Sequence, residues 1–336
     1  MADRFSPRLV NGAFEDPVLV IRFHYEGRAI LFDLGRIDRL SVREMLKISD
    51  VFVSHTHIDH FIGFDQLLRC SLNRQEELRL FGPRGFVDNV RGKLAGYTWN
   101  LIRNYSLSLV VSELDNAHVR KVELKAAHDF RLEAEEITPW SGILLRGPAF
   151  CVRAAILDHR IPCLAFALEE SSRLNVRTDV LRSLGVESGP WLGELKKSLR
   201  ESRSLENRLE MPLRGGGKKE LSLSEWRELL IVETRGQKIA YVVDNRYNEA
   251  NAEQIVALAQ NADLFYCESF FSRTDESLGQ ERCHLTAAQA GSLARRAEVR
   301  KFVPIHFSLR YQSEPDRLKE EALDAFAGKK DRKKNE

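Results

Sequence analysis

Short apolar runs dominate the first third of the chain and predict a series of strands. Runs of β-branched, leucine and aromatic residues predict four strands, at residues 18–23, 29–32, 51–54 and 78–81. A charged stretch predicts a helix at residues 41–47, and an apolar face with Leu67 and Leu68 predicts a second helix at residues 62–72.

The last third alternates strands and helices in the same way. The expected strands are 238–243, 263–267 and 301–305, and the expected helices are 251–260 and 285–296. Alternation in both halves predicts an α/β protein in layers, with its chemistry placed where strands end. Asp244 and His306 each directly follow one of these strands.

A polar segment separates the two halves. Residues 171–225 are rich in arginine and lysine, with a helical stretch at 191–209 and a glycine loop at 215–217. We expect an exposed basic arm inserted into one α/β domain of residues 1–320. Residues 321–336 are expected to form a basic, disordered tail.

Composition is that of a soluble globular protein with a sizeable core, since 43% of the 336 residues are hydrophobic and 30% are charged. No apolar run is long enough for a membrane span, and the first residues do not form a secretory signal. The five scattered cysteines form no C-x-x-C pair and predict reduced thiols in a cytoplasmic protein. The net charge is only +2, so nucleic acid would have to be bound by local patches.

Residues 55–60, with the sequence HTHIDH, carry the clearest chemical signal and directly follow a predicted buried strand. His55, His57 and Asp59 face the same way along an extended chain, and a turn brings His60 to the same pocket. Imidazole and carboxylate groups are good ligands for zinc and similar ions. The spacing therefore predicts a binuclear metal site. The alternative is a polar loop in which Asp59 caps a helix.

The pattern His-x-His-x-Asp-His resembles the signature of the metallo-β-lactamase superfamily. Three later segments resemble its ribonuclease Z branch: residues 157–162 (LDHRIP), 241–244 (YVVD) and 306–311 (HFSLRY). Asp33, in LFDLG, falls at the early aspartate of the fold, which supports the metal site from outside the ligand set. The resemblance covers about residues 28–311. It implies the metallo-β-lactamase fold, a four-layer αββα sandwich.

The resemblance also implies two divalent metal ions, with zinc expected and manganese or iron as alternatives. It assigns one ion to His55, His57 and His159, and the other to Asp59, His60 and His306, with Asp244 bridging the two. Plain alternatives exist for the later residues. His159 could be a surface histidine, Asp244 could be a turn residue, and His128 is a rival third ligand.

Two cations about 3.5–4 Å apart can share a water, lower its pKa and clamp a phosphodiester. Asp59 would orient the resulting metal-bound hydroxide and take its proton. Residues 267–271 (CESFF) and 284–286 (HLT) resemble the family's HEATF and HST segments, although Cys267 replaces a histidine. This implies that Glu268 and His284 pass a proton to the leaving ribose oxygen. The alternative is that Glu268 is a charged residue flanking a helix and that His284 caps the helix that begins at Leu285.

Residues 184–196 resemble the Gly-Pro segment of the flexible arm with which ribonuclease Z enzymes grip the transfer-RNA elbow. Eight basic residues surround it: Lys196, Lys197, Arg200, Arg203, Arg208, Arg214, Lys218 and Lys219. Such side chains bind phosphates without reading sequence. Glutamates are interspersed among these basic residues, so the alternative is that the segment is a solvated helical face that does not bind RNA. The resemblance also implies a homodimer.

The sequence thus predicts a metal-dependent endoribonuclease of ribonuclease Z type that hydrolyses the 3′ extension of tRNA precursors. The family's Gly-Thr opening is missing, and residues 36–39 replace its Glu-Gly-Thr-Gln run. A divergent hydrolase of the same fold, acting on a small phosphodiester or other ester, is therefore the alternative. A catalytically silent RNA-binding protein is disfavoured, because every expected ligand is present.

Overall fold

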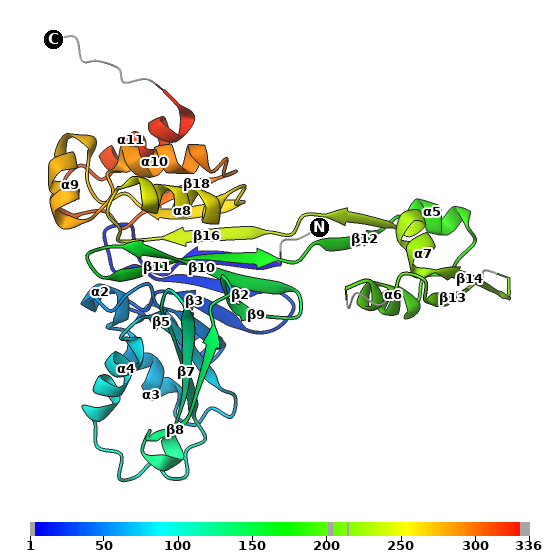
Figure 1. Cartoon of the computed structure of the whole chain (residues 1–336), viewed down its shortest axis with the longest axis horizontal. Helices are drawn as coiled ribbons and strands as arrows, with labels where there is room; N and C mark the ends of the chain where they lie inside the picture. Colours follow the sequence, from blue (N-terminus) through cyan, green and yellow to red (C-terminus); the bar gives the residue numbers. More distant parts are fainter. Residues whose placement is uncertain (1–3, 201–203, 214, 330–336) are drawn as a thin grey trace. The chain divides into compact units, whose positions relative to one another are not determined.

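The computed structural model describes residues 4–200, 204–213 and 215–329 (Figure 1). Two compact units divide the chain: a larger one, Met1–Glu169 with Gln237–Glu336, and a smaller one, Glu170–Gly236. None of the described helices is long and apolar enough to cross a membrane.

Two sheets form the centre of the larger unit. The first contains β1 (Phe5–Leu9), β2 (Leu19–Phe23), β3 (Ala29–Phe32), β4 (Ile48–Phe52), β5 (Leu78–Pro83), β6 (Ser108–Leu114), β7 (His118–Lys125) and β8 (Leu132–Pro139), in that order. The second has the order β18-β17-β16-β11-β10-β9, with β9 (Ile143–Arg146), β10 (Phe150–Asp158), β11 (Pro162–Glu170), β16 (Lys238–Val242), β17 (Leu264–Glu268) and β18 (Phe302–Ile305). The strands predicted from the apolar runs are confirmed.

Helices cover the outer face of each sheet (Figure 1). On the first sheet lie α1 (Val42–Met45), α2 (Ile58–Phe61), α3 (Phe64–Ser71) and α4 (Phe86–Ala95). On the second lie α8 (Glu249–Ala259), α10 (Ala287–Arg296) and α11 (Arg317–Ala327), with α9 (Glu276–Arg282) beside them. The described residues of this unit also form three short 3₁₀ helices: η1 (Ala126–His128), η2 (Arg273–Asp275) and η3 (Leu309–Tyr311).

Three apolar clusters hold these four layers together. The middle cluster lies between the sheets and includes Phe32 and Phe52 from the first sheet and Phe166 from the second. The outer clusters lie between each sheet and its helices. Strand β2 shows the logic, because Ile21 faces the other sheet while Val20 faces the helices. A strand buried on both faces needs a continuous apolar run, as residues 19–21 and 29–32 provide. The αββα sandwich is confirmed.

The expected disordered tail is partly wrong. Residues 321–327 belong to α11, which buries Leu318 and Ala322 against α10 and the second sheet. The apolar face of this helix contributes to the core, so charge content alone misjudged it. Residues 330–336 lie outside the described part of the chain.

Strand direction places the chemistry at one edge of the first sheet. Strands β3, β4, β5 and β6 are mutually parallel, so their carboxyl ends lie at the same edge. Asp33 follows β3 and residues 55–60 follow β4 shortly afterwards. In the second sheet, β16, β17 and β18 are also parallel. Asp244 and His306 follow β16 and β18, and Glu268 ends β17.

Gly63 allows the turn after His60 to lie against the loop after Asp33. The amide of Leu34 donates to the carbonyl of His60 at 3.0 Å, and the amide of Gly63 donates to that of Leu34 at 2.9 Å. A Cβ atom at Gly63 would lie 2.2 Å from the carbonyl oxygen of Gly35. Only glycine fits this approach, which fixes residues 55–60 relative to Asp33.

The smaller unit has a core of its own, which the prediction of an exposed arm did not anticipate. It contains β12 (Arg173–Val176), α5 (Thr178–Ser183), α6 (Trp191–Arg200), β13 (Arg208–Pro212), β14 (Lys218–Ser222), α7 (Leu223–Leu230) and β15 (Ile231–Thr234). Trp191, Leu195, Met211 and Trp226 are buried together. The described helix in the expected range 191–209 is Trp191–Arg200, and Arg208–Pro212 is a strand, so the expected helix is too long at its end.

Candidate metal centre

Four of the seven predicted ligands form one group. His55, His57, His159 and Asp244 each offer a ligand atom, and these atoms all lie within 4.8 Å of one another. His55 and His57 follow β4, His159 lies at the tip of the β10–β11 hairpin, and Asp244 follows β16. Three distant segments therefore present nitrogen and oxygen ligands to one point.

Asp59, His60 and His306 form a second group of the same kind. The Oδ2 atom of Asp59 lies 3.3 Å from His60 Nε2 and 3.4 Å from His306 Nε2. His60 is fully buried and Asp59 is about a third exposed, so the group has one face inside the protein and one open to solvent.

Asp244 lies between the two groups. Its Oδ2 atom is 3.5 Å from His55 Nε2, 3.4 Å from His60 Nε2 and 3.7 Å from His159 Nε2. Its Oδ1 atom is 2.7 Å from His306 Nδ1. The Oδ2 atom thus lies near His55 and His159 of the first group and near His60 of the second, the position that a bridging ligand requires.

Backbone strain at the strand ends directs these side chains inward. Asp33, Asp244 and His306 have φ angles of 59°, 35° and 53°, in the left-handed region that residues other than glycine rarely adopt. Asp33 and His306 directly follow a strand and Asp244 lies two residues after one, so the chain turns sharply where its strands end. Such conformations cost about 1–3 kcal/mol each and persist where the surrounding structure holds them.

Asp33 orients His60 from behind. Its Oδ2 atom accepts hydrogen bonds from His60 Nδ1 at 2.9 Å and from the Tyr241 hydroxyl at 2.8 Å, and its Oδ1 accepts from the Ser54 amide at 2.7 Å. A bond at Nδ1 leaves Nε2 of His60 pointing into the site. The supporting role that the resemblance implies for Asp33 agrees with these contacts.

The groups contain buried polar atoms that lack hydrogen-bond partners. Within the described residues, His55 Nε2 and His60 Nε2 make no hydrogen bond. An unpaired polar group buried in a protein costs about 1–3 kcal/mol, and such groups need an explanation. Bound cations explain both, because each nitrogen would become a ligand. The residues present therefore fit the metal ions that the sequence implies.

The buried carboxylates of the site also require nearby positive charge. Burial lowers the pKa of His55 to about 2, so this imidazole stays neutral, the form that binds metals. Burial alone would raise the pKa of Asp244, but His306 and His60 hold it well below its usual range. Burial alone would also lower the pKa of His306, yet Asp244 raises it to about 9. Without cations, protonated histidines must balance the buried carboxylates.

Glu268 and His284 form a hydrogen-bonded pair beside both groups, with the ring centroid of His284 5.2 Å from that of His159 and 6.0 Å from that of His306. Glu268 is fully buried, and its Oε2 atom accepts from His284 Nδ1 at 2.8 Å. Its Oε1 accepts from the Asn245 amide at 2.8 Å and the Leu285 amide at 3.3 Å. The ring of His284 stacks on Phe270 with centroids 3.9 Å apart. Asp244, Glu268, His284 and His306 also have the spacing of a metal group. Because hydrogen bonds already occupy the carboxylate of Glu268, the geometry suits a proton relay better.

Comparison with known proteins decides the family. The chain is 31% identical to ribonuclease Z of Deinococcus radiodurans over 288 residues, which cover 84% of this chain and 83% of that protein. It is 29% identical to ribonuclease Z of Treponema pallidum (strain Nichols) over 313 residues, covering 90% and 84%. No protein-family model matches the chain. The chain belongs to the ribonuclease Z family.

Solved structures agree on the fold. Human tRNase Z, short form, has a TM-score of 0.54 at 19% identity and covers 91% of this chain and 93% of its own. The metallo-β-lactamase fold protein YhfI of Bacillus subtilis has a TM-score of 0.53 at 14% identity, with 96% and 94% covered. The predicted metallo-β-lactamase fold is confirmed.

The cysteine that replaces a histidine of the ribonuclease Z family lies away from the site. Cys267 is fully buried in the cluster between the second sheet and its helices. It precedes Glu268 on β17, and neighbouring residues of a strand point to opposite faces. The replacement therefore alters packing and leaves the contact between Glu268 and His284 in place.

His128, the rival third ligand, lies elsewhere. Its side chain is more than half exposed and pairs with Glu133 at 2.6 Å. It follows β7, whose end pairs with the start of β6 at Ser108. This is the opposite edge of the sheet from the ends of β4 and β5, so His128 does not belong to either ligand group.

Sequence reasoning missed Asn251, a buried residue of α8 that joins two ligand-bearing segments. Its Oδ1 atom accepts from the Asp158 amide at 3.0 Å, and its Nδ2 donates to the Asp158 carbonyl at 3.0 Å. Nδ2 also donates to the Arg246 carbonyl at 2.8 Å. Asp158 adjoins His159 and Arg246 lies two residues after Asp244. The side-chain amide of Asn251 thus fixes both segments. Residue spacing along the chain cannot reveal such a contact, because the three residues are far apart in the sequence.

We expect Asn251→Ala to weaken metal binding by about 10–100-fold, because supporting hydrogen bonds of this kind have effects of that size. Competition with a chromogenic chelator measures the affinity, and thermal unfolding checks that the variant is folded. Glu253→Ala, an exposed change on the same helix, is the matched control. Equal affinity in folded Asn251→Ala and wild type would contradict the positioning role.

Proposed function

We propose that this chain is a metal-dependent endoribonuclease of ribonuclease Z type, which removes the 3′ extension of tRNA precursors. The observation that carries the proposal is the convergence of the predicted ligands and the Glu268–His284 pair on one site, in a chain of the ribonuclease Z family. A pocket of about 430 Å³ opens there and is lined by His57, His159, Phe270 and His284.

We propose that His55, His57 and His159 hold one metal ion and that Asp59, His60 and His306 hold the other, with Asp244 between them. Zinc suits this set of imidazole and carboxylate ligands, and manganese or iron would be accepted as well. Bound divalent cations would activate water and neutralise the negative charge of the phosphodiester.

Asp59 and His284 would carry out the two proton transfers of the reaction. Oδ2 of Asp59 faces His60 and His306, so Oδ1 is the oxygen that can orient the attacking water and accept its proton. Nδ1 of His284 is bonded to Glu268, so Nε2 is the atom that donates a proton to the leaving ribose oxygen. Burial alone would lower the pKa of His284, but the carboxylates of Glu268 and Asp244 raise it, which favours the protonated form.

The smaller unit supports RNA binding in this proposal. Of its basic residues, Arg208 pairs with Glu220 at 3.0 Å and Lys218 with Glu210 at 2.5 Å. Exposed pairs contribute little to stability, about 0–1 kcal/mol, so phosphates can compete for these cations. Arg203 and Arg214 lie outside the described residues.

A homodimer is part of the proposal, as the family resemblance implies. So is a cytoplasmic location, because all five cysteines are free thiols.

We expect purified, metal-loaded protein to cut a 3′-extended tRNA precursor next to the discriminator base. A chelator should abolish this cleavage and added zinc should restore it, because the bound metal ions lower the pKa of the attacking water. Gel separation of the products measures the result. Efficient hydrolysis of a chromogenic phosphodiester with no cleavage of the precursor would favour the alternative, a hydrolase of small phosphodiesters.

The relay makes a separate prediction about the leaving group. His284→Ala should lower the kcat for precursor cleavage by about 10²–10⁴-fold, because the ribose oxygen then leaves without its proton donor. Cleavage of a nitrophenyl phosphodiester should change little, since nitrophenolate needs no proton to leave. His128→Ala, an exposed histidine at the opposite edge, is the control. Equal losses on both substrates would show that His284 serves the metal site instead.

A further inference from the structure

The side chain of Phe270 lies flat against the imidazole of His284. The two ring centroids are 3.9 Å apart, and the ring planes are inclined by only 10°. The other ring contacts of His284 within the described residues are steep, with plane angles of 63° to His159, 68° to His306 and 70° to Phe271. Phe270 therefore covers one face of the imidazole, and the other aromatic neighbours lie around its edge.

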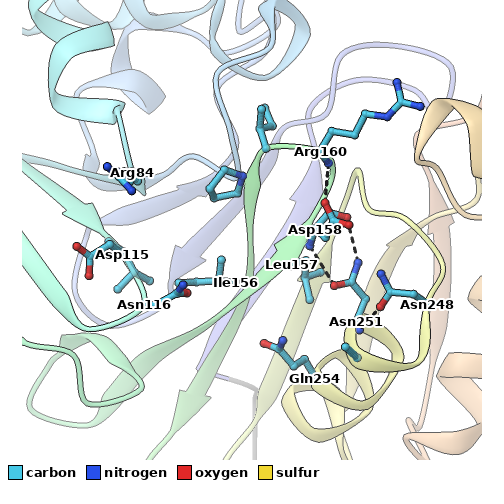
Figure 2. A pocket seen from close by; sticks show the side chains of 14 residues that line it. Arg84, Asp115, Asn116, Ile156, Leu157, Asp158, Arg160, Asn248, Asn251 and Gln254 are labelled. Atoms are coloured by element: carbon cyan, nitrogen blue, oxygen red, sulfur yellow. Dashed lines mark hydrogen bonds between the residues drawn. The ribbon is translucent and has the colours of Figure 1, made fainter.

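The backbone that carries His284 is anchored to the tip of the β10–β11 hairpin. Nδ1 of His159 donates to the Cys283 carbonyl at 2.8 Å, and the guanidinium of Arg160 donates to the Glu281 carbonyl at 2.8 Å. In Figure 2 the guanidinium of Arg160 extends away from the other labelled side chains. These two bonds fix the start of the His284 side chain and leave the orientation of its ring to side-chain contacts.

The hydrogen bond to Glu268 alone would leave the ring of His284 free to tilt. This bond joins His284 Nδ1 to the Oε2 atom of Glu268 at 2.8 Å. Hydrogen bonds to carbonyl-type oxygens tolerate a broad range of directions, so the ring can rotate about the contact without breaking it. Such a rotation displaces Nε2, because this nitrogen lies off the axis of the bond. A second contact is needed to set the plane of the ring.

Phe270 is itself held in place from several sides. Its amide donates to the Leu285 carbonyl at 3.1 Å, and its carbonyl accepts from the Ser308 amide at 3.1 Å. Its ring lies at steep angles to those of Phe271 and His306, with centroids 4.9 and 5.1 Å away. The ring is therefore a fixed surface, tied both to the segment of the relay and to the segment of a metal ligand.

We propose that Phe270 is a positioning residue of the proton relay, whose ring sets the plane of the His284 imidazole and so directs Nε2 toward the leaving ribose oxygen. The inference rests on the proposed function and adds to it the side chain that aims the proton donor. The side chain of Phe270 has no atom that can donate or accept a proton, so it acts through the imidazole. Proton transfer needs a donor and an acceptor about 2.6–3.2 Å apart, which a tilted ring cannot provide.

The contacts of Phe270 favour this role over direct binding of RNA. Aromatic side chains bind single-stranded RNA by stacking a free ring face on a base. One face of Phe270 is already stacked on His284, and the residue is half-buried, packed against the cluster between the second sheet and its helices. Stacked aromatic pairs are also a preferred arrangement in their own right, which makes the contact with His284 a stable one.

The test removes the ring without removing the apolar side chain. For Phe270→Leu and Phe270→Met, we expect the kcat for precursor cleavage to fall by about tenfold with KM nearly unchanged, because small misplacements of a reacting group slow the chemical step. Hydrolysis of a nitrophenyl phosphodiester should change little, since its leaving group needs no proton. Phe270→Tyr keeps the ring and should keep the kcat. Phe326→Leu, the same change at a half-buried ring of α11, is the matched control and should leave both rates unchanged.

A double-mutant cycle separates positioning from other roles. In the His284→Ala background, Phe270→Leu should cause no further loss of kcat, because the ring that it orients is gone. Losses that multiply, a rise in KM without a loss of kcat, or equal losses on both substrates in folded protein would each show that the positioning role is wrong, while the proposed function stands. If His284→Ala itself slows both substrates equally, or if wild type does not cut the precursor, the relay or the proposed function fails and the positioning role with it. Thermal unfolding checks that each variant is folded.

Discussion

A buried negative charge at Asp244 is the constraint on which the rest of the site depends. Its carboxylate lies within 3.7 Å of three imidazole nitrogens through one oxygen and close to His306 through the other. A carboxylate that is almost fully buried is stable only if positive charge surrounds it. Strained φ angles, close glycine contacts and the hydrogen bonds of Asp33 and Asn251 all hold ligands around this one charge.

The layered fold makes that convergence possible. Parallel strands in both sheets end at the edges that carry the ligands, so residues far apart in the chain become neighbours without long loops. The same geometry places His306, Glu268 and Asp244 at one edge of the second sheet, on three neighbouring strands.

Much of this was predictable from the sequence, because local patterns determine it. HTHIDH has ligand spacing within one segment, and HFSLRY resembles a known family in a single stretch. Contacts between distant residues could not be predicted. The hydrogen bonds of Asn251 and Tyr241 depend on packing between elements, and the core around Trp191 and Trp226 is hidden in a charged segment. The helix α11 was misjudged because its apolar face is scattered among charged residues.

Anomalous X-ray diffraction at the zinc absorption edge, from crystals of the zinc-loaded protein, would test the convergence most directly. We expect two peaks about 3.5–4 Å apart, the separation typical of two-metal sites, one on each side of Asp244. One peak would lie near His55, His57 and His159, and the other near Asp59, His60 and His306. A single peak, or peaks remote from Asp244, would contradict the two-metal site.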